Sequence, residues 1–135
     1  MDKDEELIER YQRAAVTARV RGNEARRART DGKVLYIEES EAYEAQGELA
    51  AYGWLLGDPV SPQRHLAIEA NDETMIAEYQ AADTEFQAGE ARITERGNRG
   101  SPDRFDSDEA LYYSAGVRHA LFWALSRNRP KAVAN

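Results

Sequence analysis

Acidic side chains occur at two places where their spacing would suit a divalent cation. Glu41 and Glu44 are separated by two residues, and after a spacer of 24 residues Glu69 and Asp72 show the same spacing. Mg²⁺ prefers such hard oxygen ligands and shares its coordination with substrate phosphates. These four residues and Glu48 are therefore candidate metal ligands, and they predict Mg²⁺-dependent nucleotide chemistry.

This arrangement resembles the metal-binding helices of the all-α nucleoside triphosphate pyrophosphohydrolases, which hold Mg²⁺ with Glu-x-x-Glu on one helix and Glu-x-x-Asp on the next. The stretch that begins at Glu44 also looks like the first metal helix of that group, and the resemblance implies a nucleotide hydrolase. That group usually has adjacent glutamates where this chain has Ala45. The alternative is a chance spacing, because the chain contains 16 glutamates.

Arginines are concentrated near the ends of two predicted helices, where they could bind a phosphate or nucleotide. The candidate anion-binding residues are Arg26, Arg27, Arg29, Arg96, Arg99 and Arg104. An internal duplication would place both groups at one pole beside helix N-termini, and such N-termini and arginines favour anions. The alternative is structural, because basic residues at helix C-termini complement the helix dipole. In that case the basic first helix packs beside the acidic second and third helices, and its arginines form ion pairs with them.

Aromatic residues indicate a further kind of function, contact with another protein. The candidate contact residues are Tyr52, Tyr113, His119 and Trp123. The chain has more aromatic residues than a small core must bury, and tyrosine and tryptophan are enriched at interfaces. For the three aromatic residues the alternative is packing in the core, and His119 could be a packed histidine.

Most other chemistry is excluded by residues that the chain lacks. There is no cysteine, which excludes disulfides, thiolate zinc sites, iron–sulfur clusters and cysteine nucleophiles. Neither His65 nor His119 completes the Glu-x-x-His motif of a di-iron site in a helical bundle. Motifs of serine hydrolases, phosphate-binding loops and dinucleotide-binding folds are also absent from the sequence. We therefore expect no cofactor and favour a non-enzymatic protein.

The elements that must position these residues are predicted from an internal repeat. Residues 4–14 match residues 72–82 at an offset of 68, with six of eleven positions identical. A second match has an offset of 69 and pairs Tyr43, Gly47, Ala51, Trp54 and Leu56 with Tyr112, Gly116, Ala120, Trp123 and Leu125. Apolar residues in these segments step by three and four, which is the period of a helix.

Two repeated helical hairpins predict the fold. We expect one domain over residues 1–135, with repeat 1 over about 2–60, repeat 2 over about 61–128 and a short tail over 129–135. The predicted fold is an all-α four-helix bundle, built from two duplicated antiparallel helical hairpins. Gly47 and Gly116 would lie where two helix backbones approach closely or an aromatic ring needs room, because glycine within a helix is otherwise unfavourable by about 1 kcal/mol.

Turn residues predict where the helices begin and end. Val34–Ile37 is either a short strand or the first turn of the second helix, and we favour the helix because a single strand has nothing to pair with. Ser61 would cap a turn into the third helix and start it well before Asp72. Asp106, with Glu109 three residues later, resembles a capping box for the fourth helix. Three turns separate the helices, at Thr30–Lys33, Gly57–Pro62 and Gly97–Pro102.

Composition bounds the location and the partners of the protein. The chain has 135 residues and a net charge of -7, with no apolar run long enough for a membrane span and no leader peptide, so we expect a cytoplasmic protein. This charge, without a clearly basic face, makes nucleic acid an unfavourable partner. A protein partner, or self-association as a homodimer, fits better, and a small anionic ligand is an alternative.

The bias towards arginine and alanine is typical of a high-GC genome. The twice-repeated pattern Tyr-x-x-x-Gly-x-x-x-Ala-x-x-Trp-x-Leu is similar to helices of small uncharacterised proteins of actinobacteria and their phages. This resemblance covers two helices and implies no particular activity. It leads to the hypothesis of a phage accessory factor that binds a host protein.

Overall fold

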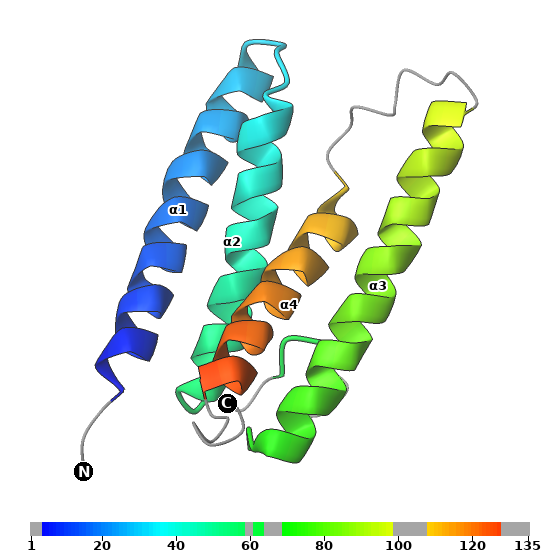
Figure 1. Ribbon diagram of the computed structural model, residues 1–135. Coiled ribbons are helices and arrows are strands. Elements are labelled where there is room, and N and C mark those ends of the chain that lie inside the picture. The colour runs from blue at the N-terminus through cyan, green and yellow to red at the C-terminus, as the bar shows by residue number, and fades with distance from the viewer. Residues whose placement is uncertain (1–3, 59–60, 64–68, 99–107, 128–135) are drawn as a thin grey trace.

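The structure, a computed structural model, describes residues 4–58, 61–63, 69–98 and 108–127. Its helices are α1 (Glu5–Thr30), α2 (Tyr36–Leu55), α3 (Asp72–Asn98) and α4 (Glu109–Arg127). Successive helices run in opposite directions within the pairs α1–α2 and α3–α4 (Figure 1). The predicted all-α four-helix bundle of antiparallel hairpins is therefore confirmed.

The helices follow one another across the molecule in the order α1, α2, α4, α3 (Figure 1). Three pairs of described helices pack closely, namely α1 with α2, α2 with α4, and α3 with α4. The expectation that the basic first helix would lie between the second and the third is therefore correct only for α2. The physical reason is that α4, which is apolar on most sides, takes the central place beside α2.

The two hairpins meet where α2 crosses α4, and glycine makes this crossing possible. A Cβ atom at Gly47 would overlap the backbone carbonyl group of Tyr113. A Cβ atom at Gly116 would overlap the carbonyl group of Glu44 in the same way. The two contacts are reciprocal, because Glu44 and Tyr113 differ by the same 69 residues as the two glycines. The prediction that these glycines mark a close backbone approach is confirmed.

Side chains near the starts of α1 and α3 fix where these helices begin. Asp4 caps α1 by accepting a hydrogen bond from the backbone N–H of Leu7 over 3.1 Å. At α3, Asn71 accepts from the N–H of Thr74 over 2.9 Å, and the Thr74 hydroxyl accepts from the N–H of Asn71 over 2.7 Å. This reciprocal cap starts α3 at Asp72. The predicted earlier start at Ser61 is therefore wrong, because Ser61 is buried in the segment between the helices.

The starts of α2 and α4 also differ in detail from the predictions. Within Val34–Ile37, α2 begins only at Tyr36, and no strand forms in this segment. The cap of α4 is Asp108, which accepts from the N–H of Leu111 over 2.9 Å. It therefore lies two residues later than the predicted cap, Asp106, which is outside the described residues.

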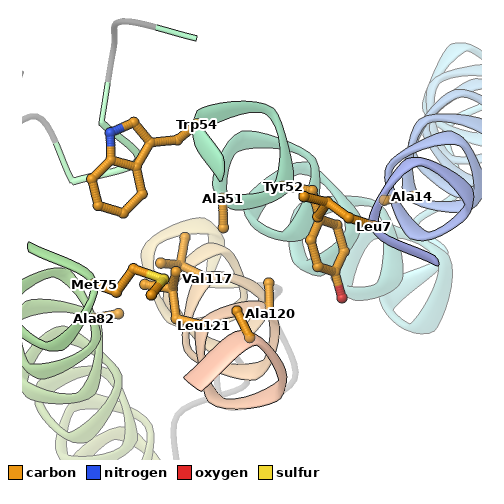
Figure 2. Close-up of a cluster of buried hydrophobic side chains, with 11 residues drawn as sticks. Leu7, Ala14, Ala51, Tyr52, Trp54, Met75, Ala82, Val117, Ala120 and Leu121 are labelled. Carbon is orange, nitrogen blue, oxygen red and sulfur yellow. The ribbon is translucent and has the colours of Figure 1, made fainter. Parts of the chain in front are cut away.

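The core extends along both sides of α2. Figure 2 shows Tyr52 beside Leu7 and Ala14 of α1, whereas the Trp54 side chain extends from the other side of α2, away from α1. Both rings are almost completely buried, at 1% exposure. On α4, Val117, Ala120 and Leu121 fill the space between the two hairpins. Both α2 and α4 therefore bury several faces, whereas α1 and α3 leave one side to solvent.

Candidate functional site

A cleft of about 270 Å³ lies where α1, α2 and α4 come together. Its lining combines both signs of charge with a histidine and a tyrosine. The residues are Arg10, Arg13, Ala14 and Thr17 of α1, Glu41, Glu44, Ala45, Glu48 and Tyr52 of α2, and His119 of α4. Arginines from one helix therefore stand opposite glutamates from another across a single hollow.

The basic wall of the cleft is held by contacts along α1 and with both α2 and α4. The guanidinium group of Arg10 donates to the Tyr52 hydroxyl over 3.4 Å and lies 4.3 Å from the centre of the Trp123 ring. Arg13 forms an ion pair with Glu9 over 2.6 Å, one turn earlier in α1. Arg10 is therefore fixed by an aromatic ring, a phenol and an ion pair with Glu6 over 3.6 Å, whereas among the described residues Arg13 has its ion pair with the solvent-exposed Glu9.

The acidic wall has one carboxylate that is not neutralised. Glu41 pairs with Arg21 over 3.3 Å, and Glu48 lies 3.4 Å from Nδ1 of His119. Glu44 is half-buried, and within the described part of the chain it has no hydrogen bond or ion pair. A ligand in the cleft would therefore meet an acceptor with unused capacity at Glu44.

Burial raises the pKa of the Glu48 carboxyl above its ordinary range, against the opposing effect of the nearby His119. The raised pKa means that ionised Glu48 is less favourable in the folded than in the unfolded protein. Stability from this group is therefore greatest below the ordinary pKa of about 4.3 and is lost as pH rises through the higher folded pKa.

We expect Glu48→Gln to raise the free energy of unfolding at pH 7, because the amide removes the ionised group that burial disfavours. The advantage should shrink as pH falls towards 4, where Glu48 is also neutral. Urea unfolding at a series of pH values between 4 and 8 measures this difference. An advantage that is constant across the series would contradict the assignment to Glu48 ionisation.

One predicted contact residue, Tyr52, lines the cleft, and another, Trp123, packs against Tyr52 without lining the cleft itself. Tyr52 belongs to the core, and burial raises the pKa of its hydroxyl, so the hydroxyl stays protonated as a hydrogen-bonding group. The Trp123 ring meets Tyr52 edge to face, with 5.8 Å between ring centres, and a second guanidinium group, that of Arg127, lies 4.5 Å from its centre. Tyr52 is therefore buried in the isolated chain, and Trp123 is half-buried.

The other two predicted contact residues lie on different sides of the bundle. The side chain of His119 is 60% exposed at the edge of the cleft. Tyr113 is half-buried elsewhere and donates its hydroxyl to the carbonyl oxygen of Pro62 over 3.1 Å. The cleft is therefore lined by His119 and Tyr52, Trp123 lies next to it against Tyr52, and Tyr113 lies elsewhere.

The predicted anion site at the arginine-rich pole is only partly described. Arg26 and Arg27 are exposed, while Arg29 donates over 2.8 Å to Glu39, whose side chain is only 4% exposed. This pairing across the α1–α2 contact follows the structural alternative. The side chain of Arg96, and the whole of Arg99 and Arg104, lie outside the described residues.

We expect Arg29→Ala to destabilise the fold more than either neighbouring substitution, because it leaves the buried Glu39 carboxylate without its partner. Arg26→Ala and Arg27→Ala remove exposed side chains, and each should change stability by no more than about 0.5 kcal/mol. Chemical denaturation of the three variants makes the comparison. Addition of Glu39→Gln should recover much of the loss, and an unchanged loss would contradict the stated cause.

The five candidate metal ligands are divided between two places. Glu41, Glu44 and Glu48 line the cleft, whereas Glu69 and Asp72 are exposed at the start of α3. Among the described residues no three histidine or acidic side chains are grouped closely enough to hold a metal ion. The spacing read from the sequence therefore does not correspond to one site in this fold.

Sequence analysis missed the basic wall of the cleft. Arg10, Arg13 and Thr17 were not singled out, because arginines on an exposed helix ordinarily form surface pairs. One signal was present, since Arg10 and Glu78 have opposite charges at an offset of 68 residues. A reversal of charge between matching positions indicates that the two hairpins use them differently.

Comparison of the chain with protein-family models, curated proteins and solved structures found no match. None of the helices in the described part of the chain is both long and apolar enough to cross a membrane.

Proposed function

We propose that this protein is a non-enzymatic helical-bundle interaction protein, and that the cleft between α1, α2 and α4 receives its partner. The observation that carries the proposal is the cleft lining, in which the arginine wall faces Glu44, a carboxylate without an ion pair in the described part of the chain. Tyrosine, tryptophan and arginine are enriched among the central residues of protein interfaces. Support also comes from His119, which lines the cleft and is exposed, and from Trp123, which contacts the lining residues Arg10 and Tyr52.

The partner that we favour is a host protein, bound in the cytoplasm by a phage accessory factor. The support is the repeated tyrosine–glycine–tryptophan pattern, which is similar to helices in small proteins of actinobacteria and their phages. A second copy of the chain is the alternative partner, and light scattering of the purified protein distinguishes it by mass.

A bulky substitution that fills the cleft tests the proposal. Thr17→Trp introduces a large ring into the lining, and Gln80→Trp adds the same ring to an exposed position on α3. The wild type and the Gln80→Trp control should retain the same protein from an actinobacterial lysate, whereas Thr17→Trp should lose it at unchanged helicity. Equal retention by all three proteins would reject the cleft as the contact site.

A second candidate function is Mg²⁺-dependent hydrolysis of nucleoside triphosphates. It is favoured by one observation, the position of Glu41, Glu44 and Glu48 opposite Arg10 and Arg13. Mg²⁺ is usually bound by only one or two carboxylates together with waters and substrate phosphates, and arginines bind phosphate oxygens with paired hydrogen bonds. Release of pyrophosphate from a common nucleotide in Mg²⁺ or Mn²⁺, lost in Glu44→Gln, would establish this activity. No release from any of the common nucleotides would end the proposal.

A further inference from the structure

The cleft has a counterpart on the other hairpin, and in the counterpart a segment of this chain is bound. Ser61 and Pro62 are buried there. The backbone N–H of Gln63 donates to the Glu78 carboxylate over 3.2 Å, and the Tyr113 hydroxyl donates to the carbonyl oxygen of Pro62 over 3.1 Å. Side chains of α3 and α4 therefore hold main-chain groups of an intervening peptide segment.

The residues that hold this segment match residues that line the cleft. Glu78 of α3 corresponds to Arg10 of α1 at the offset of 68, and Tyr113 of α4 corresponds to Glu44 of α2 at the offset of 69. Residues related by the offset of 68 are also buried alike. Leu7 and Ala14 are buried on α1, as Met75 and Ala82 are on α3.

Across the central crossing, the carbonyl groups of Glu44 and Tyr113 each face the glycine of the other helix. The positions thus match in space as well as in the sequence. The counterpart groove is a guide to what the cleft can hold.

The hydrogen-bonding character of the two matching positions is reversed. Glu78 accepts from a backbone N–H, whereas Arg10 at the matching position offers only donors. Tyr113 donates to a carbonyl, whereas Glu44 offers only acceptors when ionised. The cleft therefore suits a segment that presents a carbonyl oxygen towards Arg10 and an N–H donor or a cation towards Glu44.

We infer that the cleft binds a basic peptide segment of the partner protein through its main-chain groups, as the counterpart binds the turn at Ser61–Gln63. This inference rests on the proposed function and names the chemistry of the partner. Arg10 donates to a carbonyl oxygen of the segment, and Glu44 forms an ion pair with its lysine or arginine. Glu44 selects a basic residue because its carboxylate is half-buried and has no cation partner among the described residues.

A heptapeptide library displayed on phage particles provides the test. Peptides are selected on the full-length wild-type protein after depletion on the Thr17→Trp variant, and the enriched sequences are synthesised with a fluorescent label. We expect a lysine or arginine at one fixed position in the enriched peptides. Their affinity, measured by fluorescence anisotropy, should fall about tenfold for Glu44→Gln, which loses one charge-assisted contact. The exposed-site control, Glu90→Gln, should bind as the wild type does.

Reversal of the charge gives an independent readout. The Glu44→Arg variant, panned in the same way, should enrich acidic peptides instead of basic ones. Enrichment without a basic position, or equal binding by wild type and Glu44→Gln, would overturn the inference. Loss of the lysate partner in Thr17→Trp, together with no peptide enrichment on wild type, would reject a basic peptide segment as the ligand while leaving the proposed contact site intact.

Discussion

Gly116→Ala is expected to lower the free energy of unfolding by at least about 3 kcal/mol, which is the upper end for overpacking in a core. The added Cβ would overlap the carbonyl group of Glu44, and backbone atoms cannot move aside as a side chain can. The helices α2 and α4 must therefore separate, and their contact is the close packing that joins the two hairpins among the described residues. Urea unfolding followed by circular dichroism measures the loss.

Gly22→Ala is the matched control for this prediction. A Cβ at Gly22, on α1, would have no heavy atom within 4 Å, so alanine should stabilise the helix by about 0.5–1 kcal/mol. Gly47→Ala should resemble Gly116→Ala in size, since its Cβ would meet Tyr113 across the same crossing. Because one separation of the helices relieves both overlaps, the double variant should lose less than the sum of the two. Full additivity would contradict the shared crossing.

Trp54→Ala is expected to destabilise the fold by about 3–5 kcal/mol, the range for deletion of a large buried aromatic side chain. The ring is 1% exposed and occupies the side of α2 opposite Tyr52 (Figure 2). Deletion leaves a space that neighbouring helices can close only by moving together. The comparison is Phe122→Ala on α4, which removes a ring that is 59% exposed and should destabilise the fold far less. Similar losses from the two variants, measured by denaturant unfolding, would contradict this account of the core.

The helices and their crossing could be predicted from the sequence because periodicity and repeated residues report local structure. Gly47 and Gly116 were recognisable, since glycine in the middle of an apolar helix needs a packing reason. The order of the helices could not be predicted in the same way. Charge suggested α1 beside α2, which the Arg21–Glu41 pair supports, but it also suggested α3, because acidic helices look alike from their composition.

The candidate site was less accessible to sequence analysis than the fold. Tyr52 lies on a central helix with apolar residues on two faces, and only the arrangement of the helices decides that both faces are buried. Arg10 and Glu44 are 34 positions apart in the chain, and they become candidate binding residues only because α1 and α2 bring them to one cleft. The N-cap residues of α3 and α4 could not be predicted for a similar reason. Several polar residues near each helix start could act as the cap, and the folded structure uses Asn71 and Asp108.

The order of the helices has a consequence for how the chain reaches its native state. Contacts within the α1–α2 and α3–α4 hairpins join segments that are close in the sequence, whereas the glycine crossing joins Gly47 to Tyr113 and Glu44 to Gly116, which are 66 and 72 positions apart. The loss of chain entropy on closing a loop grows with its length, so the crossing is the entropically least favourable of the three contacts to form. Two preformed hairpins that dock through Gly47 and Gly116 would avoid most of that penalty, and substitutions at the glycines would then slow folding rather than only accelerate unfolding.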